Sequence, residues 1–335
     1  MLEHNIIVVG TSAGGVEALT YLVKHLPPDL NAAVIIVLHI SSHSKSLLPQ
    51  ILSRAGKLPV FHAQDGEAIV PGGIYVALPD HHLLVEKGYL RLTRGAKENR
   101  CRPAIDPLFR SAARTYGQRV IAVLLTGLLD DGTAGLMAVK MRRGVAIVQN
   151  PDDALYPDMP RNAIENVKDI DHILPLSDIP STLVALVNTA MEIQPENPVP
   201  NEMEFESKIV QLDLEAIENE SNRPGKPSTF GCPDCGGILW ELEEGNLLRF
   251  RCRTGHAYSA ETLLATQSDK LEDALWIALR ALEEKASLSH RMASRMEARN
   301  QTLAARFKEE AHSAKESSAI IREVLLKVNP NTDVD

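Results

Sequence analysis

The stretch Ile6–Gly15, with the sequence IIVVGTSAGG, decides how the beginning of this chain folds. Its first four residues are apolar and β-branched, which is typical of a buried strand. A Gly-rich turn follows, and a helix-like pattern of apolar residues then runs over residues 16–25. A strand, a tight turn and a helix in this order predict the first half of a βαβ unit.

Three further apolar runs, over 34–38, 120–125 and 144–149, have similar lengths and are separated by helix-length segments. Continuous apolar strands of this kind predict a parallel sheet that is covered by helices on both faces. Segments 72–77 and 90–92 read as a more exposed pair of strands that could run antiparallel. The predicted fold class is α/β, with a doubly wound, mostly parallel sheet.

Composition excludes several classes of protein. Of the 335 residues, 44% are hydrophobic, which suffices for a sizeable core. No apolar run approaches the roughly 18 residues of a transmembrane helix, and the N-terminus lacks the pattern of a signal peptide. Four cysteines do not make a disulfide framework. We therefore expect a cytoplasmic protein that does not insert into the membrane.

The charge is distributed unevenly along the chain. Residues 1–190 carry 18 basic and 18 acidic side chains, whereas residues 191–335 carry 17 and 26, so the second part accounts for the whole net charge of −9. This excess of acid argues against general nucleic-acid binding. Composition and pattern predict four parts: an α/β domain at 1–188, an acidic, Pro-rich linker at 189–229, a compact Cys-rich segment at 230–259 and a helical hairpin at 260–328.

The turn at Gly10–Gly15 places Ser12 between a strand and a helix. This context is typical of a nucleophile elbow, in which a sharp turn exposes a serine hydroxyl beside the N–H groups of a helix N-terminus. A Gly-rich turn with an incidental serine is the simpler alternative. The dinucleotide fingerprint is not met, because Ser12 stands where a glycine is required, and the Lys-Ser/Thr of a phosphate-binding loop is missing.

A base and a carboxylate follow other strands of the same predicted sheet. His39 comes directly after the run 34–38, and Asp130 and Asp131 lie just beyond the run 120–125. Parallel strands present their carboxyl ends at one edge of a sheet, where ligand sites collect. Each of these residues could be an ordinary surface histidine or a helix cap, but their coincidence favours catalysis. The order Ser, His, Asp differs from that of the α/β-hydrolases.

Four motifs, in this order, resemble the catalytic domain of CheB-type protein-glutamate methylesterases over residues 1 to about 185. They are Gly10–Gly15 (GTSAGG), Leu38–Ile40 (LHI), Cys101–Phe109 (CRPAIDPLF) and Leu125–Gly135 (LTGLLDDGTAG). The resemblance implies that Ser12 is the nucleophile, His39 the general base and then acid, and Asp131 the carboxylate of the triad. It also implies that the backbone N–H groups of Ala13 and Leu128 bind the oxyanion.

The same resemblance implies an activity and a partner. Enzymes of this family hydrolyse methyl esters of receptor glutamates and deamidate certain receptor glutamines, without a cofactor for catalysis. The expected partner is a methyl-accepting receptor or a similar signalling protein. Well-known members carry an N-terminal receiver domain; because the first strand begins at Ile6, we expect none here.

The second part of the chain contains the pattern C-x2-C-x16-C-x3-H, formed by Cys232, Cys235, Cys252 and His256. Two such knuckles around a short hairpin predict a zinc ribbon with a closed, structural Zn²⁺ site. A redox-active CxxC is the weaker interpretation. We expect the acidic linker to isolate this ribbon mechanically from the sheet.

Two long amphipathic helices joined near Asn300 predict the hairpin, which is either a solvated stalk or a docking element for a partner such as a methyltransferase or a response regulator. Two rival functions remain open. One is a signalling adaptor with little or no catalysis that binds partners through its C-terminal part. The other is a nucleic-acid-associated regulator that uses Arg249, Arg251 and Arg253, which alternate along one predicted strand.

Overall fold

The computed structural model describes residues 5–41, 46–190, 197–213, 216, 224–244 and 247–328. The chain divides into two compact units, Met1–Leu263 and Leu264–Asp335. The first unit contains both the α/β domain and the Cys-rich segment, and the second contains most of the two C-terminal helices.

Seven strands form one sheet in the order β3-β4-β2-β1-β7-β8-β9, and every neighbouring pair is parallel. The strands are β1 (Ile6–Thr11), β2 (Ala33–Leu38), β3 (Val60–His62), β4 (Ile74–Val76), β7 (Val120–Leu124), β8 (Val145–Gln149) and β9 (His172–Leu174). The strand order reverses direction between β1 and β7, which is the topological switch point of a doubly wound sheet. The predicted fold class is confirmed.

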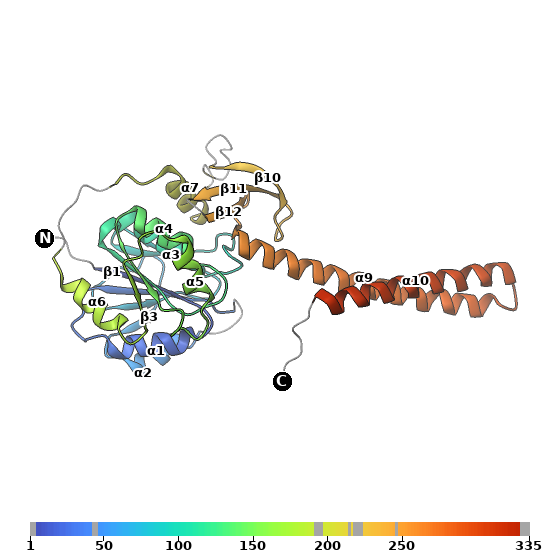
Figure 1. Ribbon diagram of the computed structural model, residues 1–335, viewed down its shortest axis with the longest axis horizontal. Helices are drawn as coiled ribbons and strands as arrows, with labels where there is room; N and C mark the ends of the chain where they lie inside the picture. The colour runs from blue at the N-terminus through green and yellow to red at the C-terminus, as the bar shows by residue number, and fades with distance from the viewer. Residues whose placement is uncertain are drawn as a thin grey trace. The chain divides into compact units, whose positions relative to one another are not determined.

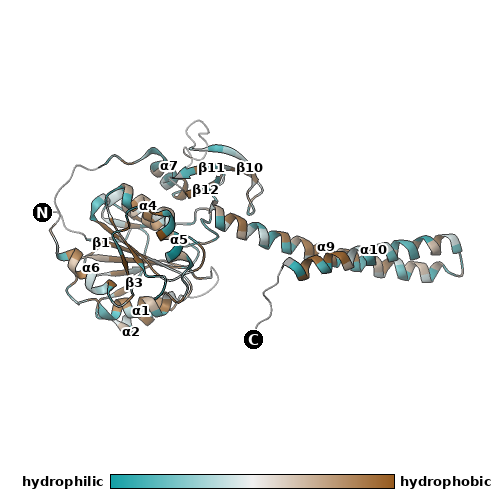
Figure 2. Cartoon of the chain, viewed as in Figure 1, coloured by the Kyte–Doolittle hydropathy of each residue, from teal (hydrophilic) through white to brown (hydrophobic). Residues whose placement is uncertain are grey.

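Helices cover both faces of this sheet (Figure 1). They are α1 (Gly15–His25), α2 (Leu48–Ala55), α3 (Ile105–Tyr116), α4 (Thr133–Met141), α5 (Asp158–Asn166) and α6 (Ile179–Asn188), with a 3-10 turn at Gly117–Arg119. Alternate residues of β1 point to opposite faces: Ile7 and Val9 pack with α1, α2 and α6, and Ile6 and Val8 pack with α3, α4 and α5. The strands are hydrophobic along their length because both faces are buried (Figure 2).

The antiparallel pairing expected between segments 72–77 and 90–92 is wrong, because each segment pairs with another strand. Strand β4, over Ile74–Val76, joins the parallel sheet between β2 and β3, because all three of its side chains are apolar and buried. The antiparallel hairpin consists instead of β5 (His82–Glu86) and β6 (Tyr89–Thr93).

The Cys-rich segment forms an antiparallel sheet of four strands, β10 (Lys226–Gly231), β11 (Ile238–Glu244), β12 (Leu247–Cys252) and β13 (Ala257–Ser259). We call this sheet the ribbon. Its core is small and consists of Cys232, Leu239, Phe250, Cys252, Tyr258 and Leu263. A core of this size supplies little stability by itself, so the ribbon needs a further source of it.

Helix α7 (Asn201–Val210) lies inside the stretch predicted as a linker. Its buried residues recur at helical spacing and include Met203, Glu206 and Ile209, so one face of the helix packs against the rest of the unit. Residues 191–196, 214, 215 and 217–223 of that stretch lie outside the described residues. The boundaries of the four predicted parts stay a prediction.

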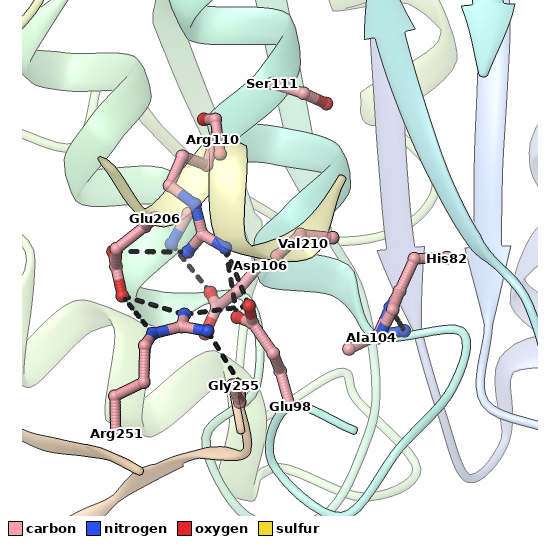
Figure 3. A network of polar contacts seen from close by, with 12 residues as sticks. His82, Glu98, Ala104, Asp106, Arg110, Ser111, Glu206, Val210, Arg251 and Gly255 are labelled. Atoms are coloured by element: carbon pink, nitrogen blue, oxygen red, sulfur yellow. Dashed lines mark hydrogen bonds and ion pairs between the residues drawn. The ribbon is translucent and has the colours of Figure 1, made fainter. Parts of the chain in front are cut away.

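A buried network of ion pairs joins α7 and the ribbon to the α/β domain (Figure 3). Glu206 of α7 accepts two hydrogen bonds from Arg249, at 3.0 Å each, and two from Arg251, at 3.0 and 2.8 Å. Arg251 also donates to Glu98 at 2.8 Å, and Arg110 of α3 donates to the same Glu98 carboxylate at 2.9 Å. All five side chains are buried.

Two expectations are corrected by this network. Mechanical isolation of the ribbon is wrong, because Arg249 and Arg251 anchor it to carboxylates of α7 and the α/β domain. The same two arginines are among the three considered for nucleic-acid binding; the third, Arg253, is exposed and lies just after β12. Arg249 and Arg251 are buried and bound to carboxylates, so they do not present charge to a phosphate backbone.

The remaining two helices are α9 (Ala260–Met296) and α10 (Gln301–Val328). They form the predicted hairpin, with Lys308 bound to Glu297 at 2.6 Å next to the turn and Arg322 bound to Glu283 farther along. Small residues pack between them, among them Ala293, Ala304 and Ala314. Within the described part of the chain, no helix has both the length and the apolar character needed to cross a membrane.

The network predicts a large stability effect at Glu206. Glu206→Gln leaves three buried arginines with one carboxylate fewer, which should lower the free energy of unfolding by about 3–5 kcal/mol. Glu202→Gln, on the exposed side of the same helix, is the matched control and should change it by less than about 0.5 kcal/mol. Denaturant unfolding of both variants at neutral pH measures the difference.

The effect of Glu206→Gln should also depend on pH. Burial by itself raises the pKa of Glu206. The charges of Arg249, Arg110 and Arg251 lower that pKa by more than burial raises it, so it lies well below its ordinary value of 4.5. A depressed carboxylate pKa stabilises the fold above the unfolded pKa and loses that contribution as the pH falls. The gap between wild type and variant should therefore be full above about pH 4.5 and shrink below it. A gap that does not change with pH would contradict this account.

Candidate active site

Three side chains meet at the carboxyl edge of the sheet, beside the switch point. Ser12 follows β1 directly, His39 follows β2 directly, and Asp131 lies in the loop between β7 and α4. The strands bring the first two together, since Thr11 of β1 is in register with Leu38 of β2. The three residues predicted from the sequence are therefore neighbours in the structure.

His39 bridges the other two residues. Its Nδ1 lies 3.2 Å from the Ser12 Oγ, and its Nε2 lies 2.8 Å from Asp131 Oδ2. A neutral imidazole that donates its Nε2 proton to Asp131 leaves Nδ1 free to accept the hydroxyl proton of Ser12. The arrangement can therefore activate a serine nucleophile.

The turn that carries Ser12 is held from two sides. The Ser12 N–H donates to the Thr126 carbonyl at 3.0 Å, and the Thr126 hydroxyl donates to the Ala13 carbonyl at 3.1 Å. Gly14 caps α1 in the left-handed region, at φ 73°, which favours glycine. A Cβ on Gly127 would lie 2.9 Å from the Ser12 Cβ, so only glycine lets that loop pass so close.

This close passage brings the Gly127–Leu128 peptide next to Ser12. The N–H group of this peptide, on Leu128, is one of the two predicted oxyanion donors. Ala13 lies directly before Gly14, the N-cap residue of α1. Among the described residues, neither the Ala13 nor the Leu128 N–H donates to a protein acceptor. Both are therefore available to a substrate oxygen.

Asp131 is buried and accepts four further hydrogen bonds. Its Oδ2 accepts from the Ile105 N–H at 2.7 Å, and its Oδ1 accepts from Asn99 Nδ2 at 2.9 Å. The N–H groups of Gly132 and Asp106 donate to Oδ1 at 3.0 and 3.2 Å. Burial raises the pKa of Asp131, but His39 and these donors lower it to about 2. The carboxylate therefore stays ionised.

The electrostatics of His39 follow from its neighbours. Burial lowers its pKa, while Cys101 and Asp131 raise it by more, and the net effect is an increase above the ordinary 6.5. These neighbours therefore favour the protonated form of the ring. Cys101, the first residue of the third motif, lies beside His39.

Asp130, the neighbour of Asp131, has a different role. Its Oδ1 accepts a hydrogen bond of 2.7 Å from the Ser259 hydroxyl at the end of β13. Burial raises the pKa of Asp130 to about 7. The two adjacent carboxyl groups thus have different partners, and only Asp131 contacts His39.

The four residues of the predicted metal site also come together. The ligand atoms of Cys232, Cys235, Cys252 and His256 all lie within 4.8 Å of one another. The distance between Cys235 Sγ and Cys252 Sγ is 3.7 Å, and His256 Nδ1 lies 3.7 Å from Cys232 Sγ and 3.5 Å from Cys252 Sγ. Ligands at about 2.3 Å around a tetrahedral zinc ion lie about 3.8 Å apart, so the set fits this ion.

Asn99 is the residue of the site that sequence reasoning missed. It lies in a short segment between β6 and α3, and its partners come from four places in the chain. A buried asparagine in a loop has no periodic pattern to mark it, and its role depends on what surrounds it. The one local sign is its position two residues before Cys101, at the start of the third motif.

Comparison with known proteins places the chain in a family. A family model described as CheB methylesterase matches residues 7–183. A Leptospira interrogans protein, provisionally named protein-glutamate methylesterase/protein-glutamine glutaminase, is 35% identical over 57% of this chain and 99% of its own length. Proteins of that name from Thermotoga maritima (34%) and Pseudomonas aeruginosa (36%) match 56% and 54% of this chain, and 55% and 52% of their own length.

A solved structure agrees with this assignment. The crystal structure of the Thermotoga maritima CheB methylesterase catalytic domain is 33% identical, with a TM-score of 0.54, and covers 56% of this chain and 100% of that domain. The matched region contains Ser12, His39 and Asp131, and it ends before the ribbon. The chain belongs to the CheB methylesterase family.

Proposed function

We propose that this protein hydrolyses methyl esters of glutamate side chains, and deamidates glutamine side chains, in methyl-accepting receptors or similar signalling proteins. The observation that carries the proposal is the position of His39 between the Ser12 hydroxyl and the Asp131 carboxylate. Family membership supports the reaction class, since the relatives are named as protein-glutamate methylesterases and protein-glutamine glutaminases.

In the first half of the reaction, the Ser12 Oγ attacks the ester carbonyl carbon and its proton passes to His39 Nδ1. The negative charge on the carbonyl oxygen is stabilised by the N–H groups of Ala13 and Leu128, each worth roughly 10²–10³-fold in rate. The tetrahedral intermediate collapses, the C–O bond to the methoxy group breaks, and His39 returns the proton so that methanol leaves. An acyl-enzyme remains on Ser12.

In the second half, His39 takes a proton from water, which attacks the acyl carbon. Collapse of the second intermediate releases the glutamate carboxylate and returns the proton to Ser12. A glutamine amide follows the same route with ammonia as the leaving group. Throughout, the ionised Asp131 holds the imidazole tautomer and stabilises the imidazolium.

The ribbon residues support a structural role for a metal. We infer that Cys232, Cys235, Cys252 and His256 hold Zn²⁺, which would supply the stability that the small ribbon core lacks. With four protein ligands the shell has no open position for a substrate. The proposed catalysis uses no cofactor, because Ser12 is the nucleophile and His39 carries each proton, while Asp131 stays ionised and orients the ring.

Receptor-type substrates and the absence of a spanning helix among the described residues agree with action in the cytoplasm. We propose the hairpin of α9 and α10 as the element that docks a partner, with a methyltransferase or a response regulator as candidates. Exposed apolar side chains along it, among them Trp276, Ile277 and Leu288, support docking. An adaptor without catalysis is the alternative, and the intact geometry at Ser12 argues against it.

Release of methanol tests the function. Wild-type protein should release methanol from a methylated receptor fragment, and Ser12→Ala should release it at least about 10⁴-fold more slowly. Because the Ser12 side chain is only partly buried, its loss should change the free energy of unfolding by no more than about 1 kcal/mol. Turnover that persists in folded Ser12→Ala protein would rule out the mechanism.

The two neighbouring carboxyl groups make a second test. Asp131→Asn removes the charge that orients His39 and should lower turnover by about 10⁴-fold. Asp130→Asn is the matched control, since its side chain contacts Ser259 and not His39, and it should cost far less. Methanol release from both variants, measured in parallel, checks the ranking; the reverse order would exchange their roles.

Elemental analysis tests the metal. The purified chain should contain one zinc ion, and Cys252→Ser should lose most of it, because a thiolate is removed from a closed shell. Cys101→Ser is the matched control and should keep the metal, since Cys101 lies beside His39 and outside the ribbon. Zinc-free wild-type protein would contradict the proposed site.

A further inference from the structure

The ribbon contacts the segment that carries Asn99. The Asn99 N–H donates to the Ala257 carbonyl of β13 at 2.8 Å, and the Ala257 N–H donates to the Lys97 carbonyl at 3.2 Å. Glu98 and Ala257 form a parallel bridge, so the segment extends the edge of the ribbon by one short pairing. The backbone around Asn99 is therefore positioned by the ribbon as well as by the α/β domain.

The side chain of Asn99 connects the ribbon to the triad. Its Oδ1 accepts hydrogen bonds from the Ser259 N–H at 3.0 Å and from the Thr262 hydroxyl at 3.2 Å. Its Nδ2 donates to Asp131 Oδ1 at 2.9 Å and to Asp106 Oδ2 at 2.8 Å. The amide is buried, and its acceptor and donor ends face opposite groups.

These four contacts decide which way the amide points. Ser259 and Thr262 offer donors, so the oxygen must face them, and the NH₂ group is then directed at the carboxylates. In the reverse orientation the oxygen would face Asp131, and two acceptors would be in contact in a buried site. Ser259 at the end of the ribbon and Thr262 in the first turn of α9 thus specify that Asn99 donates to the triad carboxylate.

Charged residues hold this contact in place. Glu98, next to Asn99 in the chain, binds Arg251 of β12 at 2.8 Å, and Arg251 also donates to the Gly255 carbonyl at 2.9 Å (Figure 3). Asp130, next to Asp131, accepts the Ser259 hydroxyl. The ribbon therefore contacts Glu98, the residue before Asn99, and Asp130, the residue before Asp131.

We propose that Asn99 is a positioning residue for the triad and that its orientation is set by Ser259 of the ribbon and Thr262 in the first turn of α9, so that the folded ribbon is a working part of the esterase. This inference rests on the proposed function of Ser12, His39 and Asp131. The acidic linker predicts a ribbon that is isolated from the sheet, whereas in this proposal catalysis depends on the ribbon. Hydrolysis of even a small ester, which needs no receptor, should depend on the ribbon.

A change in the pH profile separates positioning from general stability. Loss of the Asn99 donor leaves the Asp131 charge less compensated, and a less compensated carboxylate stabilises the His39 imidazolium more strongly. The pKa of His39 should then rise, and the acidic limb of the pH–rate profile should move to higher pH. A merely structural loss would lower the rate at all pH values alike.

Two variants of the full-length, metal-loaded protein test the proposal on p-nitrophenyl acetate and on a fluorophosphonate probe for Ser12. Asn99→Gly removes the amide but tolerates the left-handed backbone at φ 47°, and it should lower kcat/KM by roughly 10- to 100-fold with the acidic limb displaced. Thr262→Val removes one donor to Asn99 and should give a smaller loss, roughly 2- to 10-fold, with a displacement in the same direction.

Two control variants are available, one for the loss of a hydroxyl within the ribbon and one for the replacement of a threonine by valine. Ser228→Ala removes a hydroxyl that donates to the Leu239 carbonyl within the ribbon, and Thr182→Val removes one that donates to the Asp178 carbonyl in the first turn of α6. Both should keep the wild-type rate and pH profile. An Asn99→Gly profile with an unmoved acidic limb, or a Thr262→Val protein indistinguishable from Thr182→Val, would overturn the proposal.

Hydrogen exchange gives a readout besides activity. Removal of the metal with 1,10-phenanthroline should speed exchange of the Asn99 and Ala257 amides and slow labelling of Ser12, and added Zn²⁺ should reverse both. Unchanged exchange at residues 97–101 in metal-free protein would overturn the coupling. Failure of wild-type protein to label at all would instead reject the proposed function, while the exchange measurement would still report on the coupling.

Discussion

The burial of one negative charge organises this protein. Asp131 lies below the surface, where an ionised carboxylate is tolerated only if donors surround it. Those donors are the His39 ring, the first N–H groups of α3, the N–H of Gly132 and the amide of Asn99. His39, Asn99 and α3 come from different parts of the chain, so the Asp131 carboxylate is fully surrounded only when these parts have come together.

A second set of buried charges holds the ribbon against the α/β domain, beside the Asn99 that donates to Asp131. Glu98 and Glu206 are paired with three arginines from α3 and β12, and breaking one partner would leave a buried charge uncompensated. Pairs of this kind give little net stability, but they admit few alternative arrangements. In the arrangement that these pairs hold, Ser259 and Ala257 contact Asn99.

Adjacent residues show how strongly surroundings govern chemistry here. Asp130 and Asp131 have the same side chain, yet burial raises the pKa of Asp130 to about 7, whereas His39 and backbone donors lower that of Asp131 to about 2. The resemblance of the motif assigned Asp131 to the triad. The contact with His39 distinguishes the two carboxyl groups geometrically.

Local patterns in the sequence determined the main sheet, the positions of Ser12, His39 and Asp131 at its carboxyl edge, the Cys3His set and the helical hairpin. These follow from short-range rules: apolar runs predict buried strands, parallel strands share an edge, and ligand spacing predicts a knuckle. Only the tertiary structure decided the place of β4, the burial of Arg249 and Arg251, and the role of Asn99. Those depend on partners far away in the chain, such as Glu206 for Arg249 and Ser259 for Asn99, and no local pattern of a single sequence records such pairings.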